Sequence, residues 1–268
     1  MRPPPVLAVA LGLVLLLAGC GEQTGTTPQA DGATAAATPS APLPPEPTRT
    51  PPAPRPTPKP SAKPPLRALP AKLPAGLNRT TGVRGVALTF DDGPSAAWTP
   101  KVLDQLHAAH VTATFCVVGV QVRRHPQLVA RIVREGHQLC NHSWRHDMDL
   151  GRRPVAEIRA DMIRTNEAIR RAVPGAKVPF FRQPGGRWTA EEIAVARQLG
   201  MRPLHWSVDP QDWAKPTTPT IIHRVEGAAR PGAVILMHDG GGNRGGTLAA
   251  CPHLISDLKR RYGIVPLR

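Results

Sequence analysis

The stretch GVALTFDDGP, residues 85–94, sets the pattern that the rest of the chain repeats. Gly85–Phe90 is a short apolar run of the kind that forms a buried β-strand. The carboxylates of Asp91 and Asp92 follow directly, and Gly93-Pro94 then turns the chain. An apolar strand that ends in acidic side chains is typical of an α/β domain with polar groups at one edge of its sheet.

From residue 83 onward, short apolar runs alternate with segments whose apolar residues recur at helical spacing. The predicted strands are Gly85–Phe90, Ala113–Val118, His137–Asn141, Pro179–Arg182, Pro203–Val208, Ala233–Met237 and Ile264–Leu267. The predicted helices are Pro100–His110, Gln127–Glu135, Val155–Val173, Thr189–Leu199, Thr217–Ala229 and Thr247–Tyr262. This alternation indicates an α/β domain with a parallel sheet covered by helices. An open doubly wound sheet and a closed or nearly closed barrel both satisfy it.

The N-terminal segment indicates export. Residues 6–18 are apolar, follow Arg2 and are too few to cross a membrane as a helix, which is typical of a secretory signal peptide. The sequence LAGC at 17–20 resembles a bacterial lipobox. We therefore expect a lipoprotein-type signal peptide over 1–19, lipidation of Cys20, and a mature protein held on the outer face of the bacterial cytoplasmic membrane. Simple secretion into the cell wall is the alternative.

Proline is concentrated just after that segment. Of the 33 Pro among 268 residues, 15 lie within the 36 residues from Pro39 to Pro74. A segment rich in Pro, Ala and Thr buries too little apolar surface to offset the entropy lost when it becomes ordered. We predict a disordered tether over 20–80 and a folded domain over 81–268.

Ionisable side chains gather where the predicted strands end, which is where parallel α/β sheets form their binding sites. These side chains are Asp91, Asp92, His142, His146, Arg182, Asp209, Asp212, His238 and Asp239. Their distribution predicts an enzyme site.

The residue types at these strand ends suggest a hydrolytic metal. His142 and His146 are four residues apart, so on a helical turn both imidazoles face the same side. With one of the two carboxylates at 91 and 92 they form a ligand set for a divalent metal that leaves positions open for water and substrate. Arg182 can hold a neighbouring carboxylate ionised, and His238 can act as a general acid. The set favours attack of metal-activated water on an acyl group.

Five motifs occur in order along the chain, namely Thr89-Phe90-Asp91-Asp92-Gly93-Pro94, His142-Ser143-x-x-His146, Arg182-x-Pro184, Asp209-x-x-Asp212-Trp213 and Leu236-x-His238. Through them the region from about residue 83 to 268 resembles the polysaccharide deacetylases, the NodB-homology carbohydrate esterases. The resemblance implies a distorted seven-stranded (β/α) barrel. It also implies a hydrolase that acts on carbon–nitrogen bonds other than peptide bonds and removes acetyl groups from a polysaccharide.

The resemblance implies a catalytic role for four residues. Asp91 is the implied catalytic base, and Arg182 orients it. His238 is the implied general acid, and Asp212 tunes it.

The resemblance also implies a metal site and a pocket. Asp92, His142 and His146 are the implied ligands of a divalent metal, with zinc as the usual ion and cobalt, nickel or manganese as alternatives. Trp213 and Leu236 are implied to shape the pocket for the acetyl group.

One position departs from the family pattern. After Arg182-x-Pro184 the family commonly has an aromatic residue whose backbone N–H helps to hold the oxyanion, and this chain has Gly185. Glycine keeps the N–H but removes the aromatic wall. We expect Trp188, three residues later, to replace that wall against the sugar.

Two cysteines fall within predicted strands. Cys116 lies in the second predicted strand and Cys140 in the third. A Cys116–Cys140 disulfide is the alternative if the two strands are neighbours, but because the geometry for a disulfide across parallel strands is usually poor, we expect buried thiols.

The charge of the chain bears on its partners. The formal net charge is +15, and residues 81–268 contain 26 Lys and Arg against 16 Asp and Glu, a balance of +10. A basic field attracts polyanions. Since the chain carries an export signal and no nucleic-acid-binding motif, the expected partner is an anionic cell wall and not nucleic acid.

Three functions remain open on the sequence. The first is a monomeric enzyme that N-deacetylates peptidoglycan amino sugars. The second is an enzyme of the same fold that acts on chitin oligomers or acetylxylan. The third is a catalytically inactive wall-binding lipoprotein, which the complete metal and acid–base set disfavours.

Overall fold

Six parallel strands form one sheet in the computed structural model, which describes residues 66–268. The strands are β1 (Ala87–Asp91), β2 (Thr114–Val117), β3 (Gln138–Asn141), β4 (Phe180–Phe181), β5 (Arg202–Pro203) and β6 (Val234–His238), in the spatial order β5-β4-β3-β2-β1-β6. The predicted count of seven strands is wrong by one. The predicted strand Ile264–Leu267 makes only an isolated parallel bridge, between Val86 and Ile264.

The segment after β5 joins the two edges of this sheet. The N–H of Leu204 donates to Phe181 O of β4 at 2.8 Å. A few residues later, the N–H of Ser207 donates to Val234 O of β6 at 3.0 Å, and Val208 O accepts from the N–H of Leu236 at 2.9 Å. The sequence predicted one strand over Pro203–Val208, whereas the chain pairs first with β4 and then with β6. This crossing closes the sheet into a distorted barrel.

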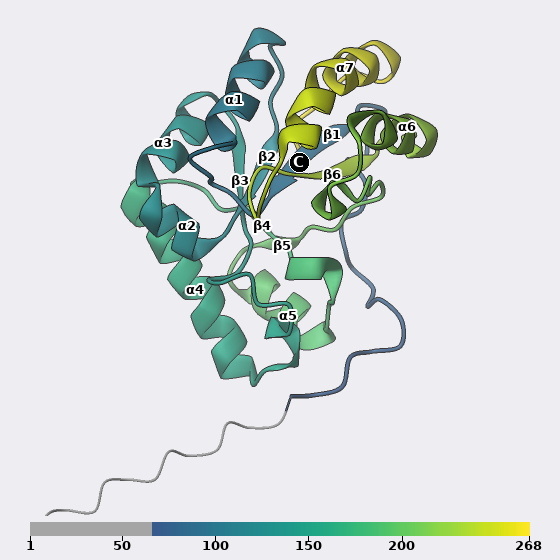
Figure 1. The fold of residues 1–268 in the computed structure, drawn as a ribbon. Coiled ribbons are helices and arrows are strands. Elements are labelled where there is room, and N and C mark those ends of the chain that lie inside the picture. The colour runs from purple at the N-terminus through teal and green to yellow at the C-terminus, as the bar shows by residue number, and fades with distance from the viewer. Residues whose placement is uncertain (1–65) are drawn as a thin grey trace, which may run out of the picture. The chain divides into compact units, whose positions relative to one another are not determined.

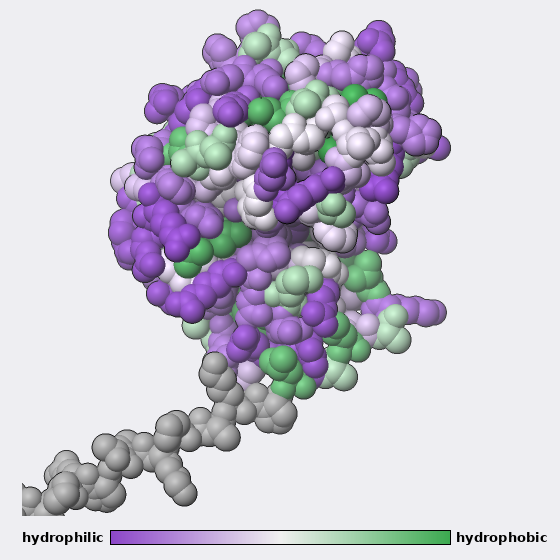
Figure 2. Space-filling view, viewed as in Figure 1, coloured by the Kyte–Doolittle hydropathy of each residue, from purple (hydrophilic) through white to green (hydrophobic). Residues whose placement is uncertain are grey.

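Helices cover the outside of the sheet (Figure 1). They are α1 (Thr99–Ala108), α2 (Gly119–Arg124), α3 (Pro126–Arg134), α4 (Val155–Ala172), α5 (Ala190–Gln198), α6 (Thr218–Ala228) and α7 (Gly245–Arg261). The short helix α2 was not predicted, because six residues are too few to show a helical period. The face of the molecule in Figure 2 is largely hydrophilic over these helices, with paler residues around a central hollow. None of the described helices is long and apolar enough to cross a membrane.

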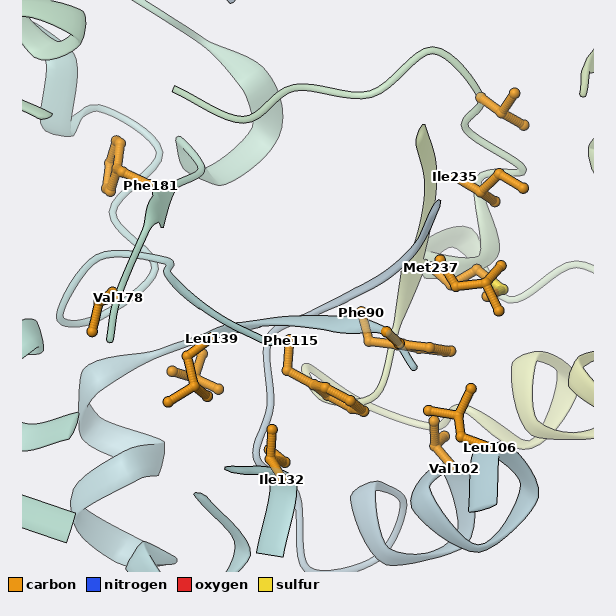
Figure 3. Packing of buried hydrophobic residues seen from close by; sticks show 14 of the residues in the cluster. Phe90, Val102, Leu106, Phe115, Ile132, Leu139, Val178, Phe181, Ile235 and Met237 are labelled. Carbon is orange, nitrogen blue, oxygen red and sulfur yellow. The ribbon is translucent and has the colours of Figure 1, made fainter. Parts of the chain in front are cut away.

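Strand residues alternate between two apolar layers. Phe90 and Phe115 stack with ring centroids 5.3 Å apart and point toward Val102 and Leu106 of α1 (Figure 3). The alternate strand positions make a second cluster inside the barrel, formed by Ala87, Cys116, Cys140, Phe180, Leu204, Val234 and Leu267. This period of two is the property of strands that decides which side chains reach the barrel interior.

Cys116 and Cys140 are paired positions of β2 and β3 and form a disulfide, with Cα atoms 4.2 Å apart. The expectation of buried thiols is therefore wrong for this pair. Both side chains point into the barrel at the same level, because residues in register on neighbouring strands share a face. Cys251 of α7 is a buried free thiol.

The ordered domain begins before residue 81. Arg67 donates to the carbonyls of Gly151 and Arg153 at 3.0 and 2.9 Å and pairs with Glu191 at 2.7 Å. The N–H of Asn78 donates to Pro203 O at 2.9 Å. Residues 66–80, which the sequence assigned to the tether, therefore lie against the folded domain. The predicted signal peptide, Cys20 and the rest of the tether fall outside the described residues.

Candidate active site

The period of two brings four of the predicted residues to one end of the barrel interior. Ala87 and Val234 face the interior, so Asp91 and His238, which lie four residues further along the same strands, face it as well. In the same way, Cys140 precedes His142 and Phe180 precedes Arg182. All four polar residues stand at or just after the carboxyl ends of their strands, above the apolar floor of the barrel.

Asp91 is held by a buried arginine. A guanidinium N–H of Arg182 donates to Asp91 Oδ1 at 2.7 Å, and the same nitrogen donates to Thr89 Oγ1 at 2.8 Å. The side chains of Asp91 and Arg182 are 3% and 0% exposed. Because removing either partner would leave a buried charge unpaired, this ion pair fixes Asp91 as an oriented carboxylate.

Asp92 turns back toward the same cavity. Its φ of +74° is left-handed, and this conformation reverses the usual divergence of neighbouring strand residues. Asp92 Oδ1 lies 3.5 Å from Nε2 of His142 and 3.2 Å from Nε2 of His146. Asp91 and Asp92 thus contribute to one site from two sides, as their separate predicted roles require.

Among the described residues, Asp92, His142 and His146 form the one group of three side chains that could hold a metal ion. Their ligand atoms all lie within 4.8 Å of one another. Nδ1–H of His142 donates to Arg182 O at 2.8 Å, which leaves its Nε2 lone pair facing Asp92. Asp92 Oδ1 is buried and makes no hydrogen bond. An orphaned carboxylate oxygen beside two imidazole nitrogens is an arrangement that a divalent cation fits.

The protonation states suit this interpretation. Burial alone would raise the pKa of Asp92, but its interactions with the adjacent His142, His238 and His146 lower it well below its usual range. Burial, together with the charge of His142, lowers the pKa of His146. The carboxylate is therefore ionised and the imidazole is neutral, which are the forms that bind metals.

Asp212 holds His238 in place through hydrogen bonds. Nδ1–H of His238 donates to Asp212 Oδ1 at 2.7 Å, and the backbone N–H of His238 donates to Asp212 Oδ2 at 2.9 Å. Thr247 Oγ1 also donates to Oδ2, at 2.7 Å. Burial would lower the pKa of His238, but the hydrogen bond and charge of Asp212 outweigh burial and raise it. His238 can therefore carry and deliver a proton.

These groups surround a cavity of about 360 Å³. It is lined by Asp91, Asp92, His142, His146, Met148, Gly185, Trp206, Asp209, Trp213, Leu236 and His238. The predicted pocket residues Gly185, Trp213 and Leu236 are among them. Arg182, Asp212 and Pro184 are buried behind the lining.

Trp188 lies elsewhere. It is 1% exposed and packs edge-on against Phe181 with ring centroids 5.6 Å apart, and its Nε1–H donates to His205 Nδ1 at 3.4 Å. A sugar cannot reach a ring that is enclosed in this way, so the structure contradicts the expectation that Trp188 replaces the missing aromatic wall.

Met148 and Trp206 line the cavity but were not predicted site residues. Trp206 falls within a predicted strand, which made ordinary packing the simpler interpretation. Met148 lies in the loop after the second histidine, where a single apolar residue gives no signal. Asp209, which the sequence placed among the ionisable side chains at the strand ends, also lines the cavity.

Known proteins resemble this chain in sequence and in structure. The family model of the polysaccharide deacetylases matches residues 78–204. A chitooligosaccharide deacetylase of Bradyrhizobium sp. (strain ANU 289) is 42% identical over 199 residues, which cover 70% of this chain and 90% of that protein. A crystal structure of a peptidoglycan N-acetylglucosamine deacetylase in complex with 4-naphthalen-1-yl-N-oxidanyl-benzamide has a TM-score of 0.67 and 35% identity, over 71% of this chain and 89% of that one.

A third relative is described as a pseudoenzyme of carbohydrate esterase family 4 from Bacillus anthracis. Its crystal structure has a TM-score of 0.64 and 29% identity, over 69% of this chain and 64% of that one. Sequence identity over nearly the whole chitooligosaccharide deacetylase, the matching family model and the shared fold agree on one assignment. This chain belongs to the polysaccharide deacetylase family.

Proposed function

We propose that this protein is a metal-dependent hydrolase that removes N-acetyl groups from the amino sugars of peptidoglycan. One observation carries the proposal: the Asp91 carboxylate, the Asp92–His142–His146 triad that could hold a metal, and the His238 imidazole face a single cavity. Amide hydrolysis needs a base for the attacking water, stabilisation of the developing charge and an acid for the leaving amine. The cavity contains a candidate for each requirement.

Asp91 is the proposed base. Its Oδ1 accepts from Arg182, and Oδ2 faces His142 Nε2 at 3.5 Å, on the metal side of the cavity. The hydrogen bond from Arg182 fixes the orientation of the Asp91 carboxylate, so that its second oxygen can accept a proton. Arg182 is thereby a positioning residue, because it reaches Asp91 and not the cavity.

His238 is the proposed acid. With Nδ1–H committed to Asp212, the ring presents Nε2 to the cavity and can deliver a proton there to the departing amine. The backbone N–H of Gly185, on the cavity wall, is the proposed donor to the negative charge that develops on the acyl oxygen. Trp213 and Leu236 bound the space for the acetyl methyl.

Asp92, His142 and His146 would hold the metal, which we propose to be zinc. A divalent cation in this place lowers the pKa of water to about 7 and polarises the acyl carbonyl. The hydrogen bond from His142 to the Arg182 carbonyl orients the imidazole for this purpose.

Peptidoglycan is the proposed substrate for two reasons. The relative with the TM-score of 0.67 is a peptidoglycan N-acetylglucosamine deacetylase. The predicted lipid anchor at Cys20, the tether over 20–80 and the +10 balance of residues 81–268 would also hold the domain at an anionic cell wall. Chitin oligomers are the second candidate, favoured by the 42% identity to a chitooligosaccharide deacetylase.

An inactive wall-binding lipoprotein is the candidate of another class, and a related pseudoenzyme gives it weight. The intact sets Asp92–His142–His146 and His238–Asp212 argue for activity. The deciding experiment measures acetate release by the zinc-loaded protein from purified peptidoglycan, chitin oligomers and acetylxylan side by side. Acetate release from peptidoglycan supports the proposal. Release from acetylxylan alone overturns the proposed substrate, and release from none of the three overturns the proposed enzymatic activity.

A further inference from the structure

The turn after β4 lacks side chains where two other segments approach it. Gly185 and Gly186 both have left-handed backbones, with φ of +65° and +67°. A Cβ atom on Gly185 would lie 2.5 Å from Met148 Cε, and a Cβ atom on Gly186 would lie 2.7 Å from Trp206 Cη2. Carbon atoms that are not bonded to each other do not approach this closely. The two glycines therefore make room for Met148 and Trp206.

Met148 and Trp206 differ in how they are held. The Trp206 ring lies 4.1 Å from the His205 ring between centroids, and the Arg182 guanidinium carbon is 5.8 Å from it. Met148 is anchored through its backbone, because its carbonyl accepts from Gln183 Nε2 at 3.0 Å. Its side chain is 44% exposed. One wall residue is thus fixed by its neighbours, while the other can change rotamer.

We propose that Met148 is a specificity-determining residue, whose thioether replaces a side chain at position 185 as the apolar wall against the bound amino sugar. This inference rests on the proposed function. Thioether side chains are flexible and polarizable and adapt to apolar surfaces of different shape. Met148 lies in the cavity lining with Gly185, and its thioether has no proton to donate. Its contribution is therefore to sugar binding and not to bond cleavage.

The first test is the kinetics of Met148→Ala in the zinc-loaded full chain, with tetra-N-acetylchitotetraose as substrate. We expect KM to rise about fivefold to tenfold, as for the loss of about 1 kcal/mol of contact, while kcat stays within about twofold. Met148→Leu is the matched control, since it keeps the apolar volume, and it should retain most of the affinity. An unchanged KM, or a fall in kcat alone, would overturn the proposal.

The second test measures binding without turnover. In an Asp91→Asn background, tryptophan fluorescence follows binding of the same tetrasaccharide with and without Met148→Ala, and we expect Kd to rise by the same factor as KM. If the wild-type protein releases no acetate from any substrate, the proposed function fails, yet this titration still decides the role of Met148. Equal Kd values in the two proteins would contradict it.

The third test asks whether Met148 occupies the space above Gly185. Asn tolerates a left-handed backbone better than other side chains, so Gly185→Asn forces Met148 out of place and should raise KM. In the double variant with Met148→Ala, the Asn side chain meets no obstacle, so its added effect should be less than half of its effect in the wild-type background. Independent effects would show that the two positions do not share this space. Equal thermal unfolding midpoints exclude a folding defect.

Discussion

The two sides of the cavity are built differently. On the interior side Asp91, Arg182, His238 and Asp212 are each at most 8% exposed and are joined by hydrogen bonds of 2.7 to 2.9 Å. We call these four residues the buried set. On the outer side Met148 and Trp213 are 44% and 51% exposed, and Gly185 contributes no side chain. We call these three the rim.

The contrast separates chemistry from recognition. In the buried set each charge has a partner, so a wrong rotamer would leave an unpaired charge in a place with little water. The rim has no such constraint, because apolar contacts are non-directional. In the proposed mechanism the reacting groups are therefore fixed before substrate arrives, whereas the surface that we propose meets the sugar can adjust.

Within the buried set, we expect a substitution of Arg182 to have the largest effect on stability and activity. Arg182→Met leaves the Asp91 carboxylate buried without its partner, which costs about 3–5 kcal/mol of unfolding free energy. The loss of an oriented base should also lower kcat by about 10²–10⁴-fold. Denaturant unfolding and acetate release measure the two effects. Arg260→Met is the control, since Arg260 is exposed and Asp257 keeps its second partner Arg261, so the loss should be about 1 kcal/mol or less. A similar loss in both variants would refute the special place of Arg182.

Asp212→Asn should shift the pH dependence. Asp212 raises the pKa of His238, so the acid stays protonated at pH values where free histidine has lost its proton. Removing that charge lowers the pKa of His238, and the alkaline limb of the kcat/KM profile should move to lower pH. Below the histidine pKa of both proteins the rates should approach each other. An unmoved alkaline limb would mean that His238 is not the acid.

The rim should respond more mildly and in a different parameter. Trp213→Ala removes an exposed ring from the cavity, and we expect KM for chitin oligomers to rise about tenfold or less with little change in kcat. Trp213→Phe keeps an apolar ring, so its KM should lie between those of the wild-type protein and Trp213→Ala. A loss of kcat as large as that of Arg182→Met would abolish the distinction between rim and buried set.

The disulfide should affect activity least. Cys116 and Cys140 close a loop of 24 residues beneath the site, so the double change to Ala should lower the free energy of unfolding by about 2–4 kcal/mol. Acetate release at low temperature should stay near wild type, since neither sulfur reaches the cavity lining. Cys251→Ala is the comparison without a cross-link. A large fall in kcat would show that the hydrogen bonds of the buried set are not enough to hold it in place, and that the disulfide is also needed.

The same contrast explains what the sequence could predict. Asp91, Arg182 and His238 follow from two local rules, the strand period and the carboxyl-end location of α/β sites. Local patterns also predicted most helices, because their apolar faces extend over several turns. The spacing of His142 and His146 made them candidate metal ligands, whereas the choice of Asp92 as the third came from the family resemblance.

The rest depends on contacts that no local pattern encodes. Met148 reaches the cavity only because Gly185, 37 residues later, lacks a side chain. Cys116 and Cys140 pair because of strand register, and Arg67 joins the domain through carbonyls about 85 residues away. Trp188 misled the prediction since nearness in sequence says nothing about which side of a turn a ring takes.

The most direct test of the account compares the wild-type protein with Asp91→Asn, both loaded with zinc. Acetate release from purified peptidoglycan and metal content are measured on the same samples. We predict equal zinc content and a fall in acetate release by about 10²–10⁴-fold, because we assign Asp91 to the reaction and Asp92 to the metal. Acetate release at the wild-type rate, or loss of zinc together with activity, would contradict this division of the two neighbouring carboxylates.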